Sequence, residues 1–290
     1  MSPVSPGRFR VEAMISRLHR RAAGCGIGIV LALGAWVPSA AFGSPDAHGH
    51  LLHIVKPGLR ANANESGNWF GYNQGILEQG GEQFHSIVGV WTVPSARQHT
   101  KGTAESSSTW IGIGGGCVDA KCAMGDPTLI QTGSEQDVSA AGKPSYSAWW
   151  EIIPGPSIEI GKLMVRSGDR MRASIAETLP SLWRITLTNL TTRQTFRRTV
   201  PYTSTHATAE WIQETPIVVG ANAGLAALPN LSRTSFDRAR VNGAPAQLRS
   251  SERILLASKD KVIGTPSAPD GQRDGFALCT WSTKCPAPSG

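Results

Sequence analysis

The stretch that decides the fold reads Arg170-Met171-Arg172-Ala173-Ser174-Ile175-Ala176, with an apolar side chain at every second position. The same alternation recurs in Trp183-Arg184-Ile185-Thr186-Leu187. Because successive side chains of a β-strand point to opposite faces, each stretch is predicted to be a strand with one buried and one solvated face. The turn residues Ser167-Gly168-Asp169 and Asn189-Leu190-Thr191-Thr192 bound these strands and indicate hairpin connections.

Together with these two stretches, the sequence predicts strands on both sides of them. β-Branched and aromatic runs bounded by turn residues mark residues 84–94, 109–113, 128–131, 145–153, 162–166, 171–178, 182–189, 194–199 and 209–214. Charged residues make up only 17% of the chain, which contains 32 Gly and 19 Pro. Many short antiparallel strands without interleaved helices are typical of a β-sandwich or barrel. The expected fold class is therefore all-β.

The charge distribution argues against nucleic-acid binding. The formal net charge is +7, but Arg8, Arg10, Arg17, Arg20 and Arg21 against Glu12 give residues 1–43 a net +4, which leaves +3 for the remainder. No basic run with interleaved aromatic residues occurs in the sequence.

The first 43 residues have the pattern of a signal peptide. A basic segment, Arg17-Leu18-His19-Arg20-Arg21, precedes an apolar run from 22 to 37, and small residues at 38–43 offer cleavage sites. The run is too short for a membrane anchor. We therefore expect a protein secreted to the extracellular space or periplasm, with no membrane association after cleavage.

Three segments follow the signal peptide. Residues 44–64 are polar and are predicted to be a linker or short pro-segment; His48, His50 and His53 in it are expected to be solvated, with metal binding as the alternative. Residues 65–250 form the predicted β-domain. Residues 251–290 carry several prolines and two cysteines, and are expected to be a loop-rich tail.

Four cysteines remain in the processed chain. An even number in an exported protein indicates disulfides, and of the three possible pairings we favour Cys117–Cys122 and Cys279–Cys285, because each closes a short loop. Their spacing is not that of a zinc finger, and no histidine cluster accompanies them in the sequence. Neither a metal nor a cofactor is expected.

Most familiar catalytic motifs are missing from the sequence. It contains no Gly-x-Ser-x-Gly elbow, no His-Glu-x-x-His and no Walker loop. His206 is the only histidine after residue 100, so a Ser-His-Asp triad has little to build on. The remaining candidates are carboxylates and an amide in aromatic-rich strands, namely Gln131, Glu151, Glu210 and Glu214.

From about residue 68 to 236 the chain resembles the glutamic peptidases (eqolisins, peptidase family G1). The resemblance is carried, in order, by Asn68-Trp69-x-Gly71, Val88-Gly89-x-Trp91-Thr92-Val93-Pro94, Trp110-x-Gly112-Ile113, Leu129-Ile130-Gln131-Thr132-Gly133, Tyr146-x-Ala148-Trp149-Trp150-Glu151, Gly168-Asp169, Asn189-Leu190-Thr191-Thr192 and Glu210-Trp211-Ile212-x-Glu214. It implies a sandwich of two antiparallel sheets with a concave substrate cleft.

The resemblance also implies a catalytic pair, Gln131 and Glu214. A carboxylate in the role of Glu214 takes a proton from water and returns it to the leaving amine. An amide in the role of Gln131 donates to the developing oxyanion, and one such donor is typically worth about 10²–10³ in rate. Trp110, Glu151 and Glu135 resemble substrate-binding residues of the cleft.

Three departures from the family pattern concern acidic residues. Gly114 stands where the family usually has Asp, Ser147 occupies a position that often carries an acid, and Glu135 stands in for a nearby Asp. Fewer neighbouring carboxylates mean less mutual perturbation of their pKa values, so a less acidic pH optimum is expected.

The function predicted from the sequence is that of a secreted, monomeric endopeptidase acting on polypeptides without metal, cofactor or covalent intermediate. Two alternatives remain. The first is a glycosidase that uses Glu151 and Glu214 as paired carboxylates. The second is a non-catalytic β-sandwich that binds peptide or glycan.

Overall fold

A computed structural model of the 290-residue chain describes residues 50–53, 60–62, 64–119, 121–219, 223–259 and 261–289. The predicted signal peptide lies outside the described residues. Residues 47–290 form one compact unit. Within the described residues no helix is long and apolar enough to cross a membrane.

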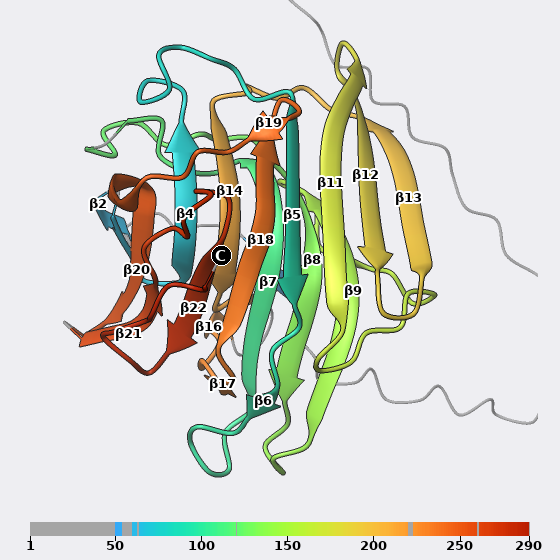
Figure 1. The fold of residues 1–290 in the computed structure, drawn as a ribbon. Helices are drawn as coiled ribbons and strands as arrows, with labels where there is room; N and C mark the ends of the chain where they lie inside the picture. Colours follow the sequence, from blue (N-terminus) through green and yellow to red (C-terminus); the bar gives the residue numbers. More distant parts are fainter. Residues whose placement is uncertain are drawn as a thin grey trace, which may run out of the picture. The chain divides into compact units, whose positions relative to one another are not determined.

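Two antiparallel sheets make up this unit (Figure 1). The first sheet has the strand order β10 (Ile158–Glu159), β9 (Pro144–Ile152), β8 (Leu129–Val138), β7 (Glu105–Gly114), β14 (Thr208–Glu214), β4 (Trp69–Gly75) and β20 (Arg253–Ser258). The second has the order β13 (Gln194–Pro201), β12 (Leu182–Asn189), β11 (Arg170–Leu179), β5 (Ser86–Thr92), β18 (Thr234–Val241), β22 (Phe276–Thr280), β21 (Lys261–Pro266) and β20. Strand β20 belongs to both sheets.

Short elements complete the architecture. Strand β1 (His50–Leu52) pairs with β15 (Ile217–Val219), which pairs with β16 (Gly224–Leu225). Strand β6 (Ala96–Arg97) pairs with β17 (Asn230–Leu231). The second sheet and its loops also include β2 (Arg60–Asn62), β3 (Glu65–Ser66), β19 (Ala244–Pro245) and the 3₁₀ turn η1 (Ser250–Glu252). The arrangement confirms the predicted all-β sandwich.

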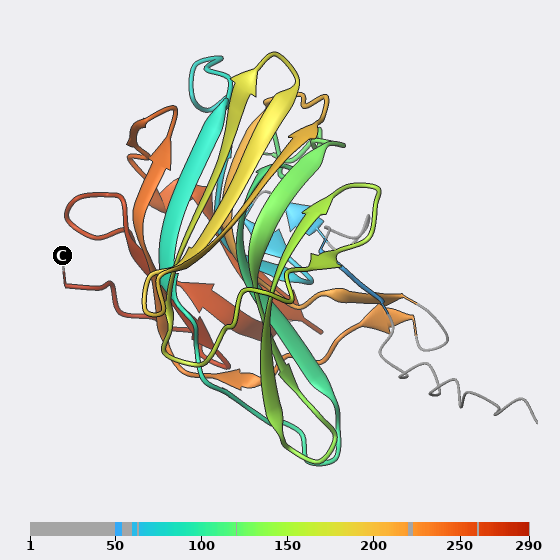
Figure 2. The same ribbon diagram turned by 90° about the vertical axis from the view of Figure 1, so that its right-hand side faces the viewer.

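The period-2 patterns of the sequence create the core between the two sheets. In β11 and β12 the buried residues alternate with exposed or partly buried ones, as predicted: Ile175 and Ile185 are fully buried and face each other across the hairpin. They join one large apolar cluster with Ile111 and Trp211 of the first sheet. Figure 2 shows the strands of the two sheets in separate layers. Burying each such side chain stabilises the fold by about 1.5–3 kcal/mol.

The first sheet is buried on both faces. Its inner face packs into the core, and its outer face carries a second apolar cluster of Trp69, Trp110, Leu129, Trp149 and Ile212. Strands β7, β8 and β14 therefore show almost no exposed positions, although they contain many polar residues. Buried polar side chains on the outer face of a sheet indicate a functional site there.

The expected strand over 162–166 is wrong. Leu163 and Val165 are buried as its alternation suggested, but the segment belongs to no ladder. The backbone of Met164 is instead satisfied by side chains, since its carbonyl accepts from Asn189 Nδ2 and its N–H donates to Gln194 Oε1. These side-chain bonds replace the ladder.

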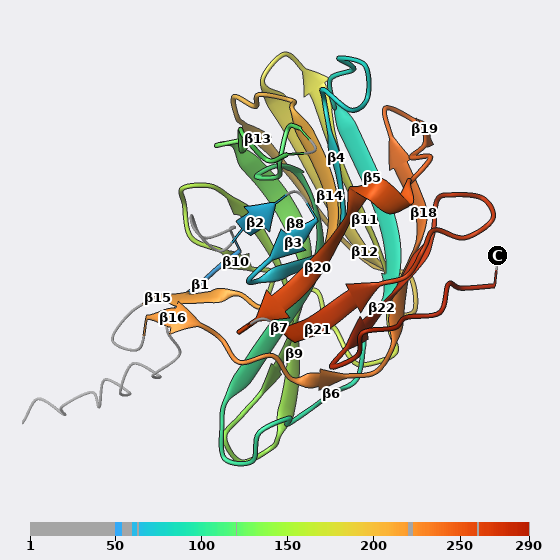
Figure 3. The ribbon, with the colours of Figure 1, turned by 90° about the vertical axis from the view of Figure 1, so that its left-hand side faces the viewer.

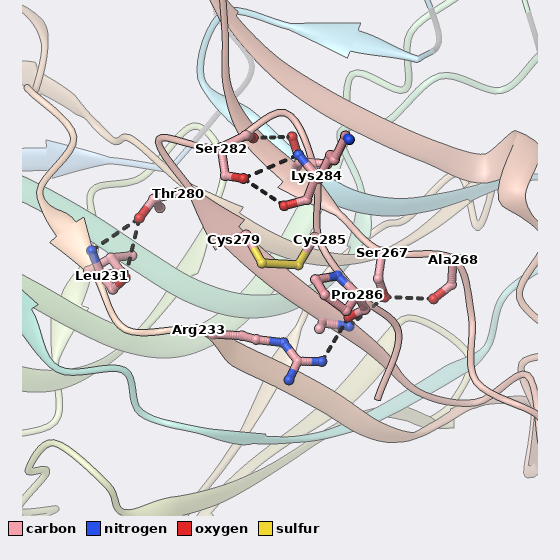
Figure 4. The surroundings of a disulfide bond; sticks show 12 residues. Leu231, Arg233, Ser267, Ala268, Cys279, Thr280, Ser282, Lys284, Cys285 and Pro286 are labelled. Carbon is pink, nitrogen blue, oxygen red and sulfur yellow. Dashed lines mark hydrogen bonds between the residues drawn. A yellow bond between two sulfur atoms is a disulfide. The ribbon is translucent and has the colours of Figure 1, made fainter. Parts of the chain in front are cut away.

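The expectation of a loop-rich tail over 251–290 is also wrong. Strands β20, β21 and β22 extend the second sheet, and Ile254, Leu256, Phe276 and Leu278 are buried. These three strands are short, and the prolines in this part of the sequence led to the prediction of a loop. Loops remain between β21 and β22 and after β22, where the Cys279–Cys285 disulfide holds the chain beside Arg233, which donates to the Pro286 carbonyl (Figure 4).

Both favoured cysteine pairings are present in the structure. Cys117 is bonded to Cys122, and Cys279 to Cys285. Each disulfide closes a short surface segment, which is the geometry expected for an exported protein.

Candidate active site

The two predicted catalytic residues lie on one surface, the outer face of the first sheet, because their strands pair in a register that points both side chains to the same side. Gln131 of β8 pairs with Gly112 of β7, and Glu214 of β14 pairs with Ser108, which lies four residues before Gly112 along β7. Residues separated by an even number of positions share a face. Although they are 83 positions apart in the sequence, the two side chains thus lie on the same face of the sheet, on the two strands that flank β7, and both are fully buried.

The residues predicted to bind substrate surround the pair. Glu151 of β9 pairs directly with Gln131, and Glu135 of β8 pairs with Ser108, next to Glu214. Trp110 projects from the same face of β7 and belongs to its apolar cluster. The structure therefore brings all five predicted site residues together.

Gly112 keeps the space beside Gln131 open. A Cβ atom at this position would lie 3.3 Å from Gln131 Cβ and 3.0 Å from the Trp110 ring. Any side chain larger than hydrogen would crowd both residues. The glycine of the Trp110-x-Gly112 motif is explained by this close approach.

Hydrogen bonds fix the orientation of both catalytic candidates. Trp110 Nε1 donates to Glu214 Oε2 at 2.7 Å, and Asn68 Nδ2 lies 3.5 Å from Glu214 Oε1. Gln131 Nε2 donates to Glu151 Oε2 at 2.7 Å. Trp110 thus orients the carboxylate as well as packing beside it, and Glu151 sets the direction of the amide.

His53 lies at the centre of the site, and the expectation that it is solvated is wrong. Its ring Nδ1 is 3.1 Å from Glu214 Oε2 and its Nε2 is 3.5 Å from Glu135 Oε2. Its backbone N–H donates to Glu151 at 3.2 Å, and its carbonyl accepts from Gln131 Nε2 at 2.6 Å. The ring stacks on Trp149, with centroids 3.8 Å apart.

The segment that carries His53 enters the site as an added strand. His50, Leu51 and Leu52 pair antiparallel with Val219, Val218 and Ile217 of β15 (Figure 3). One signal in the sequence could have revealed this role. Leu51-Leu52-His53-Ile54-Val55 is an apolar run inside an otherwise polar segment, and such a run in a linker indicates a docking sequence rather than a solvated one.

Burial controls the protonation of the site. Loss of solvent is the main cause that raises the pKa of Glu214 and Glu135 well above the usual range, and for Glu135 the nearby Asp137 and Glu214 add to the effect. Desolvation likewise raises the pKa of Glu151 to about 7. It lowers the pKa of His53 to about 4, against the opposing effect of Glu151 and Asp137.

These shifts predict that the chain is more stable in acid than at neutral pH. A raised carboxyl pKa contributes stability that is complete below pH 4.5 and, for Glu151, is lost as the pH rises to about 7. The lowered pKa of His53 acts in the opposite direction over a similar range, from 6.5 down to about 4. These two effects offset each other, so Glu135 and Glu214 decide the sign.

Calorimetry of the full chain at about pH 4 and about pH 8 would measure this dependence. We expect the higher Tm at the lower pH, and we expect the double variant Glu135→Gln/Glu214→Gln to flatten the difference. A Tm that rises with pH in the unmodified chain would contradict the assignment of these two carboxyls as the buried, neutral groups.

Comparisons with known proteins agree with the fold and show the family. The model of the Peptidase A4 family matches residues 67–272. Aspergillopepsin-2 from Aspergillus niger is 26% identical over 217 residues, which cover 66% of this chain and 72% of the relative. The crystal structure of scytalido-glutamic peptidase with a transition state analog inhibitor has a TM-score of 0.55 at 19% identity, and the match covers 74% of this chain and 98% of that one. A structure of an eqolisin family member in complex with the tripeptide Ala-Ile-His has a TM-score of 0.53 at 19% identity, with the same coverage.

The class of protein follows from the fold, the site and these relatives. It is that of the glutamic peptidases, which are hydrolases of the acid protease type. The chain belongs to the Peptidase A4 family, the eqolisins.

Proposed function

We propose that the chain is a secreted, monomeric endopeptidase in which Glu214 activates water and Gln131 stabilises the oxyanion. One observation carries the proposal. The carbonyl oxygen of His53 accepts a hydrogen bond from Gln131 Nε2 at 2.6 Å, while Glu214 lies 3.1 Å from the ring of the same residue. The backbone carbonyl of His53 therefore lies where the mechanism requires the scissile carbonyl of a substrate, within hydrogen-bonding distance of Gln131.

The chemistry needs only these two side chains and water. The Glu214 carboxylate accepts a proton as a water molecule attacks the scissile carbonyl carbon, and the Gln131 amide donates to the oxygen that becomes negative. Glu214 then returns the proton to the departing amine, and the C–N bond breaks. Neither a covalent intermediate nor a metal enters these steps.

Glu214 must be ionised to act as a base. Burial is the main cause of its raised pKa, and His53 is part of what covers it. When this histidine leaves and water enters, the desolvation penalty falls and so does the pKa of Glu214. Departure of His53 therefore both opens the site to substrate and favours the ionised form of Glu214 that acts as the base.

The neighbouring residues support an extended polypeptide as the substrate. Glu151 accepts from a backbone N–H of the bound segment, Trp149 offers a flat surface for a side chain, and β15 offers a strand edge. An extended peptide that adds to a sheet edge gains main-chain hydrogen bonds independent of its sequence. The tripeptide bound to the eqolisin relative, Ala-Ile-His, also contains a histidine after an aliphatic residue, as Leu52-His53 does.

We further infer that residues 44–64 are a pro-segment, which blocks the active site through His53 until it is removed. His53 fills the place of a substrate residue and contacts both Gln131 and Glu214. A tethered segment binds with a high effective concentration, so even modest contacts keep the site closed. Export through residues 1–43 and removal of the pro-segment afterwards would deliver the active enzyme outside the cell.

Digestion of a denatured protein by the processed enzyme at about pH 3–6 tests the proposal. We expect Gln131→Ala to lower kcat by about 10²–10³, because one oxyanion donor is lost. A glycosidase that used Glu151 and Glu214 would keep its activity on glycans in this variant. If the unmodified enzyme cleaves no polypeptide in this range while it still binds peptide, the non-catalytic alternative is correct.

A further inference from the structure

A second cluster of chemically reactive side chains lies outside the active site. It consists of His85, Glu177 and His206, and we call it the His-Glu-His cluster. Glu177 Oε2 is 2.7 Å from His85 Nδ1 and 3.0 Å from His206 Nε2. All three candidate ligand atoms lie within 4.8 Å of one another.

The cluster joins the two sheets at the end of β14 that is remote from Glu214. Glu177 belongs to β11 and His85 directly precedes β5, both in the second sheet, while His206 lies two residues before β14 of the first. His206 and Glu214 are eight residues apart, about 26 Å along an extended chain. The cluster is thus separate from the catalytic pair.

The protein holds the three side chains in place through its backbone. The Phe84 N–H donates to the His206 carbonyl at 3.0 Å, and the Glu177 N–H donates to the His85 carbonyl at 2.9 Å. The Ser181 N–H donates to Glu177 Oε1 at 2.7 Å, which leaves Oε2 for the two rings. His206 has a φ of 58°, an unfavourable backbone conformation for a residue with a side chain.

We propose that the His-Glu-His cluster is a binding site for one divalent transition-metal ion, with Zn²⁺ as the preferred ion. Two imidazoles and one carboxylate are a common zinc ligand set, with metal–ligand distances of about 2.0–2.2 Å. Tetrahedral coordination would place neighbouring ligand atoms roughly 3.3 Å apart, so the two contacts of Glu177 Oε2, at 2.7 and 3.0 Å, need to open only slightly. The His85 side chain is 52% exposed, which leaves a fourth position open to water.

The backbone hydrogen bond to Glu177 Oε1 is the kind of outer contact that orients a metal ligand. The bound ion would connect the loop before β14 to β11 and β5. Its role is therefore to stabilise the junction of the two sheets, and peptide hydrolysis at Glu214 does not depend on it.

Titration of the full chain with Zn²⁺ at about pH 7.5, followed by calorimetry, tests this site. We expect one bound ion per chain and a rise in Tm of about 5 °C or more at saturation, because a ligand that binds only the folded state stabilises it. His85→Gln is the main variant, since its half-exposed ring contributes little to packing. It should weaken Zn²⁺ binding at least tenfold and abolish the Tm rise.

His99→Gln is the matched control. His99 stacks on Trp281 and lies near Asn230, so this variant also loses one ring, and it should bind Zn²⁺ normally. Glu177→Gln keeps the shape of the third ligand and should lose binding as His85→Gln does. Visible absorption of Co²⁺ bound to the unmodified chain gives a readout that needs no variant, because tetrahedral Co²⁺ absorbs intensely.

The proposal is wrong if the unmodified chain binds no Zn²⁺ or Co²⁺, or if binding is unchanged in His85→Gln. The second result would assign the ion to histidines elsewhere in the chain, those of residues 44–64 included. Peptidase activity enters none of these measurements, so a failure here leaves the proposed function untouched.

Discussion

Replacing Glu214 by Gln is expected to lower kcat by about 10³–10⁴ while the fold stays intact. The substitution keeps the size of the side chain and the oxygen that accepts from Trp110 Nε1. It removes the carboxylate that takes the proton from water, and general acid–base catalysis is worth about 10²–10⁴ in rate. Initial rates on an internally quenched peptide, measured with the processed enzyme across acidic pH, give the number.

Glu252→Gln is the matched control for this experiment. Glu252 is another buried glutamate with a raised pKa, but it bonds to Gln74 and Gln79 by η1, away from Gln131. It should show the unmodified kcat. If Glu214→Gln retains activity within tenfold of the unmodified enzyme, Glu214 is not the base and the proposed mechanism fails.

A peptide of residues 44–64 is expected to inhibit the processed enzyme, and His53→Ala in that peptide should weaken inhibition by about 10²-fold. The alanine loses the ring contacts to Glu214 and Glu135 and the stack on Trp149, while the two backbone bonds to Gln131 and Glu151 remain. Each lost contact is worth about 1 kcal/mol, and 1.4 kcal/mol corresponds to tenfold in affinity.

The inhibition constant, obtained from initial rates, measures this effect. A peptide with residues 50–53 in scrambled order has the same composition and should not inhibit. The uncleaved chain should be at least about 10³-fold less active than the processed enzyme, because the tether adds to all of these contacts. Equal potency of the peptide and its alanine variant would show that His53 does not block the site.

The strand pattern of the sequence predicted most of the sandwich, because period-2 alternation is a local property. Residues 171–178 and 182–189 became β11 and β12, with the predicted buried faces. The pattern failed where backbone groups are satisfied by side chains, as at Met164, or where prolines punctuate short strands, as after Arg253. These outcomes depend on partners distant in the sequence.

The site could be predicted only in part. Family motifs pointed to Gln131 and Glu214, but no local pattern indicates that β14 inserts between β4 and β7 and so places Glu214 close to β8. His53 was missed because the segment that precedes Leu51 is polar and the partners of His53, Trp149 and Glu214, are far along the chain. Burial created by tertiary contacts, rather than residue type, gives this histidine its role.

The three-stranded sheet β1-β15-β16 has a consequence for handling the mature protease. Departure of β1 would leave the main-chain donors and acceptors of Ile217–Val219 without their antiparallel partner on that side. An exposed edge strand of this kind can pair with any extended chain, including a strand of another copy of the enzyme. Activated preparations should therefore self-associate at high concentration, and a saturating substrate-like peptide should keep them dispersed.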